Sequence, residues 1–312
     1  MLLKLPAGGD ALWIDLLNPT EAERLEAETL TGLTLPTQAN LSEIESSSRL
    51  RSRDGVLTMS TPMISVADAS PRGLSPIGFV LSSETLVTVR FSALKAFDEV
   101  VAEFHTPPEA PTCALEVFVR LCDEMVDRMA DALEIISASL NDLSATVFNA
   151  EDIKGRAAKH ANSRLRDQLK LAGQMGDRAS NTRDALLGLG RVLAFVGALT
   201  KDWSDARFEP RIDSLKQDVT SLTDYEVHLS DKVQFLLDAL VGMIGIAQND
   251  IFKILTIVSI VGIPPTLMAS IYGMNFKIMP ELSWTLGYPY GLAVIVVSAI
   301  IPVIWFKYRG WF

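Results

Sequence analysis

The sequence predicts an α+β membrane protein: an N-terminal α/β domain, then long helices, then two membrane-spanning helices. Two uncharged runs carry the membrane part of this prediction, 18 residues at 254–271 and 19 residues at 288–306. Each run is close to the roughly 20 residues with which a helix crosses the core of a bilayer. The third observation concerns residues 1–250, which are charged and combine short strand patterns with long helical periodicity. Two buried helices of a soluble protein are the alternative, but helices of soluble proteins rarely stay uncharged for so long.

Basic residues set the expected orientation of the two spans. Lys253 precedes the first span, and Lys307 and Arg309 follow the second, whereas Lys277 and Glu281 are the charges of the short connection. The positive-inside rule then places both chain ends in the cytoplasm and the connection outside. We expect the protein in the inner membrane of a bacterial cell, with the first span directing insertion because the N-terminus is too weakly apolar for a signal peptide.

The charge of the chain limits its partners. The net charge is −10, and residues 251–312 carry four basic residues and one acidic residue, so that the first 250 residues hold −13. A soluble part this acidic attracts cations and repels nucleic acid. The sequence contains neither a G-x-x-x-x-G-K-[ST] loop nor a glycine-rich dinucleotide turn, and its three histidines are scattered. We therefore expect no enzyme activity, no organic cofactor and no nucleotide partner.

Residues 1–110 have the pattern of a small α/β domain. Thr20 and Glu23 fit a capping box at the start of a helix, and Gly32 fits its end. Asp54-Gly55 predicts a tight hairpin turn. The expected strands are 12–17, 50–53, 56–66, 77–81 and 85–90, the expected helices are 20–30, 41–47 and 94–104, and the expected loop is 71–76.

Residues 111–209 are predicted to form a hairpin of two long helices. The first helix begins at about residue 112 and is acidic on its outer face, and the second covers 151–199 and has a basic middle. This charge pattern predicts an antiparallel pair with facing charges, each pair contributing well under about 1 kcal/mol. The pattern breaks at 203–210.

Residues 210–250 are predicted to form a stalk helix with a coiled-coil seam. Apolar residues recur at heptad spacing, with Glu226 as the exception, at Ile212, Leu215, Val219, Leu222, Leu229, Val233, Leu236, Leu240, Met243 and Ala247. The helix is expected to continue to Tyr272, a length of roughly 93 Å at about 1.5 Å per residue. We infer that the seam marks parallel self-association around a shared axis.

Heptad spacing continues into the first span. Two adjacent rows hold most of its hydroxyl groups: Asn249, Thr256, Ile263 and Ser270, and Phe252, Ser259, Thr266 and Gly273. Hydroxyl groups on one face of a membrane helix either bond to a neighbouring helix or line a pore. Continuity with the seam favours the pore. Neither span holds an ionisable residue, so a passing cation would keep much of its water, which suits magnesium and, nearly as well, cobalt or nickel.

The segment after the first span carries a specific motif. Gly-Met-Asn lies at 273–275 and Met-Pro-Glu-Leu at 279–282. This combination resembles the CorA family of divalent cation channels, and Ile-Pro-Pro-Thr at 263–266 fits the same family. The resemblance is close over about 240–312 and looser in the N-terminal domain, where Trp-Ile-Asp-Leu at 13–16 is similar.

The resemblance implies a funnel-shaped homopentamer, in which cytoplasmic α/β/α domains are attached to long stalk helices that become the pore. Divalent metal ions, further copies of the chain and the lipid bilayer are the implied partners. The expected segments are the α/β domain (1–110), the long-helix hairpin (111–209), the stalk (210–250), the first transmembrane helix (251–273), the external loop (274–287), the second transmembrane helix (288–306) and the cytoplasmic tail (307–312).

The resemblance also implies roles for individual residues. Gly273, Met274 and Asn275 would shape an outer selectivity filter, with Asn275 contacting the hydrated ion. Glu281 would add an external acidic ring, with an ordinary loop carboxylate as the alternative. The pore lining and the inner gate would consist of Asn249, Phe252, Leu255, Ile263, Thr266 and Ser270. Apolar constrictions close by dewetting, which suits the gate.

The family closes when intracellular magnesium binds between subunits, and Asp238 matches a position of that kind. Asp224 and Asp231 share its heptad position, off the seam, so that three carboxylates lie along one flank of the stalk. A solvated outer face is the alternative for these aspartates. The sequence does not place a partner carboxylate for Asp238.

Together these features predict a potential-driven magnesium channel that also admits cobalt and nickel. A zinc transporter of the ZntB branch is the first alternative, because it shares the fold and the Gly-Met-Asn triplet. A membrane-anchored coiled-coil scaffold that conducts nothing is the second. Lys277, where many relatives have an acid, and a tail with only Lys307 and Arg309 as basic residues would weaken the attraction of cations and lipids.

Overall fold

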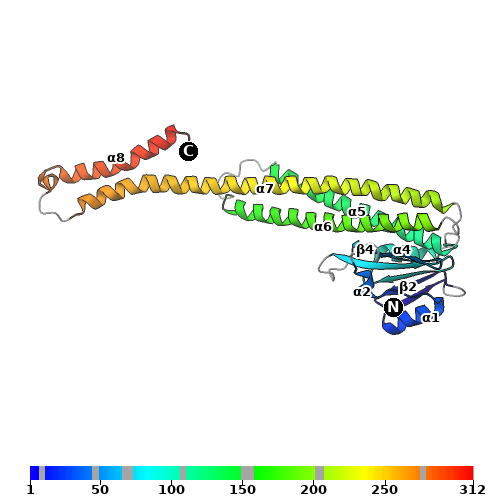
Figure 1. The fold of residues 1–312 in the computed structure, drawn as a ribbon. Coiled ribbons are helices and arrows are strands. Elements are labelled where there is room, and N and C mark those ends of the chain that lie inside the picture. The colour runs from blue at the N-terminus through cyan, green and yellow to red at the C-terminus, as the bar shows by residue number, and fades with distance from the viewer. Residues whose placement is uncertain are drawn as a thin grey trace. The chain divides into compact units, whose positions relative to one another are not determined.

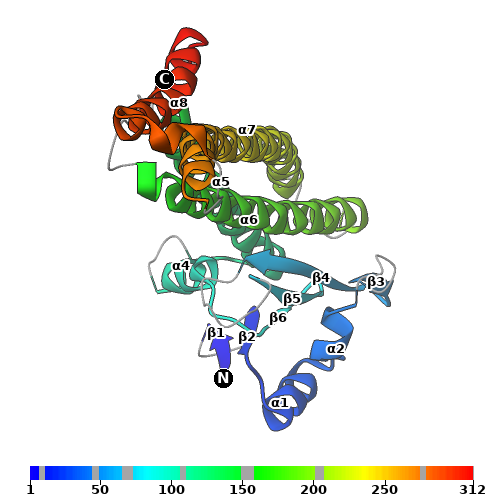
Figure 2. The same cartoon turned by 90° about the vertical axis from the view of Figure 1, so that its left-hand side faces the viewer.

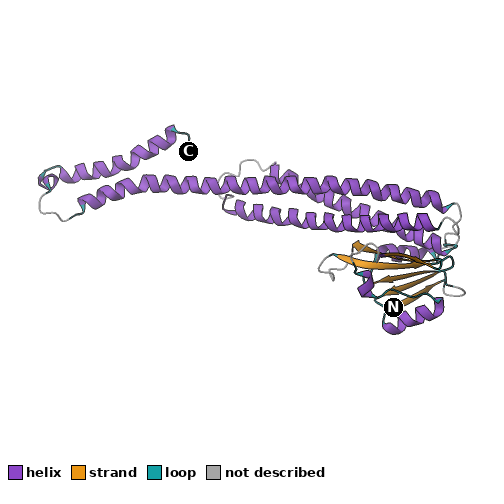
Figure 3. Cartoon of the chain, viewed as in Figure 1, coloured by secondary structure: helices purple, strands orange, loops and turns teal. Residues whose placement is uncertain are grey.

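The computed structural model describes residues 1–6, 11–43, 49–64, 73–105, 110–148, 158–200, 207–274 and 279–311. The chain divides into two compact units, of which one comprises Met1–Asp152 with Asp167–Leu237 and the other Ile153–Arg166 with Asp238–Phe312. Figure 1 gives the order of the elements along the chain. Figure 3 shows that the strands all belong to the N-terminal domain and that the described remainder is helical.

A six-stranded sheet forms the centre of the N-terminal domain. Its strands are β1 (Leu2–Leu5), β2 (Trp13–Leu17), β3 (Leu50–Arg53), β4 (Val56–Ile64), β5 (Leu74–Leu81) and β6 (Leu86–Arg90). They lie in the order β1-β2-β6-β5-β4-β3. Only β2 and β6 are parallel neighbours among these strands, and the other pairs are antiparallel. β1 was not predicted from the sequence.

Two short helices, α1 (Glu21–Thr31) and α2 (Gln38–Leu41), cover one face of this sheet. The buried cluster between them and the strands consists of Ile14, Leu16, Ala27, Leu35, Leu41, Val80, Val87 and Val89. α2 approaches β5 so closely that a Cβ atom added at Gly78 would lie 2.7 Å from the Leu41 side chain. Glycine at position 78 therefore sets the depth at which α2 packs.

The opposite face of the sheet carries helix α4 (Lys95–Glu103) and the first turns of α5 (Ala114–Phe148). The Trp13 ring lies 5.9 Å from Phe97, and Phe79 lies 5.5 Å from Phe118 in an edge-on contact. Figure 2 shows the two helical layers on either side of the strands. The predicted α/β/α arrangement is therefore confirmed.

The turn signals of the sequence are largely confirmed. Thr20 and Glu23 form the capping box of α1, and Gly32 ends the helix at a φ of 68°. Asp54 and Gly55 both have positive φ, 49° and 77°. Two positive φ angles in succession are typical of a type I′ hairpin turn, the turn whose twist matches the flanking strands.

Most of the short helix expected at 41–47 lies outside the described residues, which omit 44–48, and a separate short helix, Gln38–Leu41, capped by Thr37, comes before it. One boundary was predicted wrongly. The loop expected at 71–76 ends earlier, because β5 begins at Leu74 and Pro76 pairs with Pro62 of β4. Proline lacks an N–H group, but two opposed prolines suit a non-hydrogen-bonded position of an antiparallel ladder, which needs no donor from either residue.

A buried polar network joins the parallel strands β2 and β6. Arg90 Nη2 lies 2.9 Å from Asp15 Oδ2, and the two side chains are 6% and 3% exposed. Thr88 Oγ1 donates to Asp15 Oδ1 (2.7 Å), and Trp13 Nε1 donates to Thr88 Oγ1 (2.9 Å). The carboxylate thus has both a charged partner and a hydroxyl donor, which a buried charge requires. The network also fixes the register of the two strands.

Long helices follow the sheet. α5 runs parallel to α7 (Phe208–Tyr272), because Tyr225 Oη donates to Ser137 Oγ (2.9 Å) and Lys232 Nζ donates to Asn141 Oδ1 (2.5 Å). The acidic face of α5 contributes Asp123, which pairs with Arg211 of α7. Charges of α5 are therefore paired with α7 as well as with α4.

Helix α6 (Ala158–Leu199) runs antiparallel to α7. Cβ atoms added at its glycines would come within about 3.3 Å of α7 side chains, at the pairs Gly176–Val233, Gly190–Val219 and Gly197–Ile212. Small residues on α6 therefore allow the two helices to approach closely. Since α5 and α7 are parallel, α5 and α6 run in opposite directions, as predicted, whereas the charge pairs expected between these two helices stay a prediction.

The heptad seam of α7 is buried within one chain. Ile212, Leu215, Val219, Leu229, Val233, Leu236 and Leu240 are 0% to 6% exposed without any second copy. The glycine contacts show that α6 covers this seam, so its interpretation as a self-association surface is wrong over 212–240. A heptad stripe predicts that a face packs against a helix, but it does not identify the chain that supplies the helix.

Glu226, the exception in the seam, is completely buried. Ser230 Oγ donates to Oε1 of this carboxylate (2.6 Å), and Arg183 Nε of α6 lies 3.8 Å from Oε2. Oε2 has no hydrogen-bond partner among the described residues. The seam thus tolerates one carboxylate because α6 brings a guanidinium toward it.

The last two long helices have the composition of membrane spans. α7 contains an apolar window of mean hydropathy 2.0, and α8 (Gly287–Tyr308) one of 2.1. A 3-10 turn, η1 (Pro280–Ser283), precedes α8. Lys253 Nζ of α7 lies 5.8 Å from the Trp311 ring beyond α8, so the apolar part of α7 and α8 form an antiparallel hairpin.

Candidate ion pathway

The predicted pore-lining residues lie on one bare face of α7. Phe252, Leu255 and Ile263 are 65%, 59% and 64% exposed in the single chain. Asn249, Thr266 and Ser270 are exposed as well. A stripe that combines hydroxyl groups with large apolar side chains is therefore uncovered along the whole apolar part of the helix.

The partly covered face of the same segment is on the other side of the helix. Its residues are Lys253, Ile257, Val261, Pro264, Pro265, Met268 and Tyr272. At roughly 100° per residue, this stripe is centred roughly half a turn from the predicted pore row. Lys253 belongs to it and lies beside Trp311, which identifies it as the face toward α8. The pore row therefore points away from the second apolar helix of its own chain.

The hydroxyl groups of the row bond to their own helix. Thr256, Thr266 and Ser270 each donate to the carbonyl oxygen four residues earlier, at 2.8 Å. Within the described residues these hydroxyl groups donate no bond to α8. This argues against the alternative that they join the two helices of the hairpin. A hydroxyl that donates to the backbone keeps its lone pairs available to water or to a hydrated cation.

The expected filter begins where α7 ends. Gly273 N donates to Ala269 O (3.0 Å) and Met274 N donates to Ile271 O (3.2 Å), which tightens the last turn. A Cβ atom added at Gly273 would lie 3.2 Å from the Ala269 carbonyl oxygen, so a larger residue would press on the backbone. Met274 is 46% exposed. Asn275 and Lys277 lie outside the described residues.

The backbone of Glu281 lies in the turn η1, which Ser283 closes by donating from Oγ to Pro280 O (2.7 Å). The side chain of Glu281 lies outside the described part of the structure. The Trp284 ring contacts Tyr290 of α8, with 5.8 Å between centroids. This aromatic pair attaches the turn to the start of the second apolar helix, where amphipathic rings suit a membrane interface.

The three stalk aspartates, Asp224, Asp231 and Asp238, are all exposed and lie off the seam, as predicted. Among the described residues, no three acidic, histidine or cysteine side chains come together as a metal site. A metal bound at this flank would therefore need ligands from another chain or from residues outside the described ranges. The structure leaves their regulatory role as a prediction.

A separate acidic surface lies on α4 and the start of α5. Partial burial raises the pKa of Glu124, and the nearby charges of Asp127, Glu99 and Glu103 raise it further, against a lowering by Arg128. Carboxylates that repel one another in this way attract cations from solution. The sequence predicted this character from the acidic face of the helix, but not the contribution of α4.

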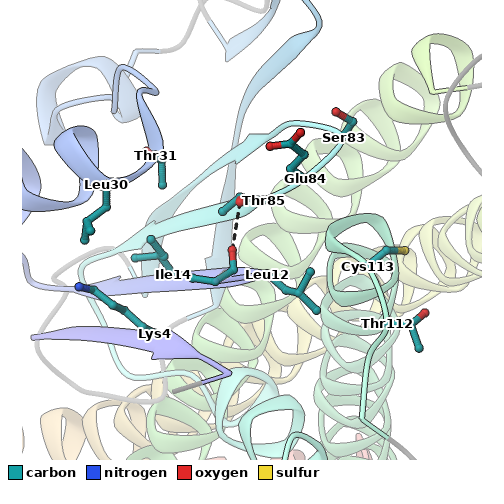
Figure 4. A pocket seen from close by; sticks show the side chains of 11 residues that line it. Lys4, Leu12, Ile14, Leu30, Thr31, Ser83, Glu84, Thr85, Thr112 and Cys113 are labelled. Carbon is teal, nitrogen blue, oxygen red and sulfur yellow. Dashed lines mark hydrogen bonds between the residues drawn. The ribbon is translucent and has the colours of Figure 1, made fainter. Parts of the chain in front are cut away.

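A hollow of about 730 Å³ on the N-terminal domain is drawn in Figure 4. Its wall combines Lys4 of β1, Ile14 of β2, Leu30 at the end of α1 and Glu84 in the turn before β6. Thr85 Oγ1 donates to the Ala11 carbonyl oxygen across it (3.0 Å). Lys4 is already paired with Glu26 (3.2 Å), so its charge is partly compensated.

The sequence could not have identified which face of the first span is turned toward α8. Hydropathy is high on every side of this segment, so only the partial covering of the 253–272 stripe reveals it. In the sequence, the charge of Lys253 indicated only the orientation of the first span. Its contact with Trp311 shows that it also joins the two apolar helices at one end.

The family model described as CorA-like Mg2+ transporter protein matches residues 8–308. The chain belongs to the CorA-like Mg2+ transporter family. The magnesium transport protein CorA of Haemophilus ducreyi is 31% identical over 302 residues, which cover 97% of this chain and 92% of that protein. The magnesium transport protein CorA of Escherichia coli K12 is 30% identical over 302 residues, with the same coverage.

Solved CorA structures have the same fold. The complete CorA magnesium transporter of Methanocaldococcus jannaschii matches with a TM-score of 0.77 at 17% identity, covering 99% of this chain and 95% of that one. The cytoplasmic domain of ZntB from Vibrio parahaemolyticus matches with a TM-score of 0.51 at 13% identity, covering 74% of this chain and 86% of that one. The predicted membership of the CorA family and the predicted fold class are confirmed. The roles of individual pathway residues stay predictions.

Proposed function

We propose that this chain transports magnesium across a bacterial inner membrane, by passing hydrated Mg2+ through a pore that α7 forms with further copies of itself. The observation that carries the proposal is the uncharged, hydroxyl-bearing row of α7, which faces away from α8 and ends at Gly273. Two relatives aligned over 97% of this chain, both named magnesium transport protein CorA, support the choice of ion.

The pore requires several copies, because one helix cannot enclose a path for an ion. Leu236 and Leu240 are fully buried within the single chain, whereas Met243 and Ala247 are only partly covered. Copies would therefore meet along α7 beyond Leu240, where the intrachain seam ends. The family resemblance supports five copies.

The chemistry of the row favours a hydrated ion. Hydroxyl and amide oxygens without a carboxylate bind cations weakly, and magnesium gives up its water reluctantly. The ion would then pass with its water shell, and hydrated cobalt or nickel would follow the same path. Phe252 and Leu255 would close the narrow cytoplasmic end by excluding water. Asn275 would select at the outer end, and Glu281 would concentrate cations outside it.

The driving force would be the membrane potential. A charge that crosses the membrane gains about 2.3 kcal/mol per 100 mV, and a divalent ion gains twice that amount. The basic residues Lys253, Lys307 and Arg309 support cytoplasmic termini, so an inside-negative potential would draw magnesium inward. Neither nucleotide nor organic cofactor is part of the proposal.

Regulation would act on the stalk. Asp238, with Asp231 and Asp224 along the same flank, would bind magnesium between neighbouring copies and stabilise the closed state when the ion is plentiful inside. The exposure of all three carboxylates supports this role, since an intersubunit ligand must be uncovered in the single chain. Inhibition of uptake by internal magnesium, compared between the wild type and Asp238→Ala, tests it: equal inhibition contradicts it.

Uptake by the purified full-length protein in liposomes tests the proposed function. We expect magnesium uptake that rises with an inside-negative potassium diffusion potential and does not depend on a proton gradient. Zinc uptake that needs a proton gradient, without magnesium uptake, would support the ZntB alternative. An intact oligomer that transports none of magnesium, cobalt or zinc would support the scaffold.

Cysteine modification tests which face of α7 lines the pore. In a Cys113→Ser background, Ser270→Cys is expected to lose at least about 90% of its uptake after a charged methanethiosulfonate reagent is added, because the modified side chain blocks the path. Met268→Cys, on the face toward α8, is the matched control and should keep most of its uptake. Cys122 will not interfere, since it is buried and burial raises the pKa of its thiol. Equal block at both positions would reject the assignment.

A further inference from the structure

Three arginines line one hollow of the N-terminal domain. Arg51 and Arg53 lie at alternate positions of the edge strand β3 and therefore project to one face, and Arg49, just before the strand, lines the same hollow. The hollow that they line has a volume of about 590 Å³. Figure 2 shows β3 at the edge of the sheet, with α1 and α2 on one side of the strands.

The remaining walls of this arginine hollow are neutral except for Asp54, which lies beside Arg53 in the turn between β3 and β4. The segment after α1, residues 32–36, and Leu41 of α2 form one side, and Val56, Thr58 and Ser60 of β4 form the base. Apolar carbons thus lie opposite the guanidinium groups. Sites for small organic ligands are typically 300–1,000 Å³ in volume and combine an apolar wall with a few convergent polar groups.

Ser60 gives an independent indication of a ligand. It is 6% exposed, and its Oγ has no hydrogen-bond partner among the described residues. A buried hydroxyl without a partner is unfavourable, and native proteins contain few such groups. Ser60 lines the arginine hollow and also borders a smaller cavity beside Gly188 and Arg191 of α6. A polar group bound in the arginine hollow would supply the missing bond.

The charges of the arginine row are weakly compensated within the described part of the chain. Arg49 Nε donates to the Glu43 carbonyl oxygen (2.6 Å), which leaves its positive charge in place. Arg53 lies 3.5 Å from Asp54, but both side chains are about 90% exposed, so solvent screens this pair. Three guanidinium groups within five residues are conspicuous in a chain of net charge −10.

We propose that the arginine hollow binds a small anion that carries phosphate groups. Guanidinium groups present paired N–H donors that match phosphate oxygens, and they bind them more tightly than neutral donors do. The sequence lacks a phosphate-binding loop, which excludes that kind of cradle but not a row of arginines. A concave site with a buried hydroxyl at its base favours a small ligand over an acidic segment of another chain. The proposal does not depend on the proposed transport activity.

Calorimetric titration of the full-length protein in detergent, with EDTA present, tests this inference. Sodium pyrophosphate and ATP are the two probes, and at least one is expected to bind saturably, with an affinity that falls as salt is added. Tighter binding of ATP would show that the apolar wall is occupied, and equal binding would show that the phosphates suffice. The absence of saturable binding for both probes would overturn the proposal.

Variants separate specific binding from general attraction. Arg51→Gln is expected to weaken binding at least about tenfold, since a charge-assisted hydrogen bond is lost. Arg178→Gln, an exposed arginine of α6, is the matched control and should bind as the wild type does. Ser60→Ala should weaken binding while leaving the melting temperature unchanged or higher, because the hydroxyl has no partner to lose. Unchanged affinity in Arg51→Gln would contradict the proposal, whether or not the oligomeric mass of this variant is altered.

Discussion

Asn275→Ala is expected to abolish selective magnesium uptake, lowering the initial rate by at least about 100-fold. A single hydrogen bond contributes about 1 kcal/mol, but every copy around a shared pore loses its amide at once. The combined loss for several copies would amount to a few kcal/mol in the binding of a hydrated ion, which corresponds to two or more orders of magnitude. The measurement is magnesium influx into liposomes at a fixed diffusion potential.

The control for this variant is Gln174→Ala, which removes an exposed amide from α6, far along the chain from the filter motif. It should transport as the wild type does. Size-exclusion chromatography of both variants would show whether assembly is preserved. Normal, selective uptake by an intact Asn275→Ala protein would show that this amide does not form the filter.

Asp15→Ala is expected to produce the largest loss of stability, about 3–5 kcal/mol. The substitution leaves the guanidinium of Arg90 buried at 6% exposure without its carboxylate, and it also removes the acceptor of the Thr88 hydroxyl. Arg90 would keep its contact with the Phe97 ring (4.6 Å) and its bond to the Ser92 carbonyl oxygen. These cannot neutralise a buried charge. The first thermal transition of the full-length protein in detergent should fall by more than about 10 °C.

Two further variants test whether the uncompensated charge of Arg90 causes this loss of stability. Asp15→Ala combined with Arg90→Leu should recover part of the loss, because the second change removes the uncompensated charge. Asp54→Asn removes the charge from an ion pair whose side chains are about 90% exposed, and asparagine tolerates the positive φ of this turn, so the transition should stay unchanged. A protein with Asp15→Ala that melts at the wild-type temperature would show that the network between β2 and β6 contributes little to stability.

The correction of the heptad seam changes how assembly is explained. Residues 212–240 of α7 pack within one chain, so the N-terminal half of the helix has its apolar face satisfied before any second copy is present. The stretch from Met243 onward does not. Self-association is therefore expected to depend on the membrane end of α7. The arrangement also explains Glu226, which faces Arg183 of α6.

Local signals predicted most of the elements correctly. The capping box of Thr20 and Glu23, the αL glycine at position 32 and the Asp54-Gly55 turn depend on a few neighbouring residues and need no distant partner. The errors were also local in origin. Pro76 was assigned to a loop because proline disfavours strands, and only its pairing with Pro62 shows how a strand accommodates it.

The candidate site also has one part that the sequence predicts and another that it does not. The polar row of the first span, from Asn249 to Ser270, could be found by counting residues, because helical periodicity alone places side chains on a common face. The face toward α8 could not, since an apolar helix carries no pattern that distinguishes lipid from a neighbouring helix. The arginine hollow was missed as well. Arg49, Arg51 and Arg53 are visible in the sequence, but the loop at 32–36 and Ser60 that complete the hollow come from other elements.

The sequence by itself determined the two apolar spans, the filter motif between them, the turns and caps of the N-terminal domain and the membership of the CorA family. These features follow from the length, order and polarity of neighbouring residues. Only the tertiary structure decided that α6 covers the seam of α7, that β2 and β6 pair in parallel through Asp15 and Arg90, and that the pore row faces away from α8. The physical reason is that a pattern of apolar residues specifies that a surface is buried, whereas the partner depends on the fit between surfaces far apart in the chain.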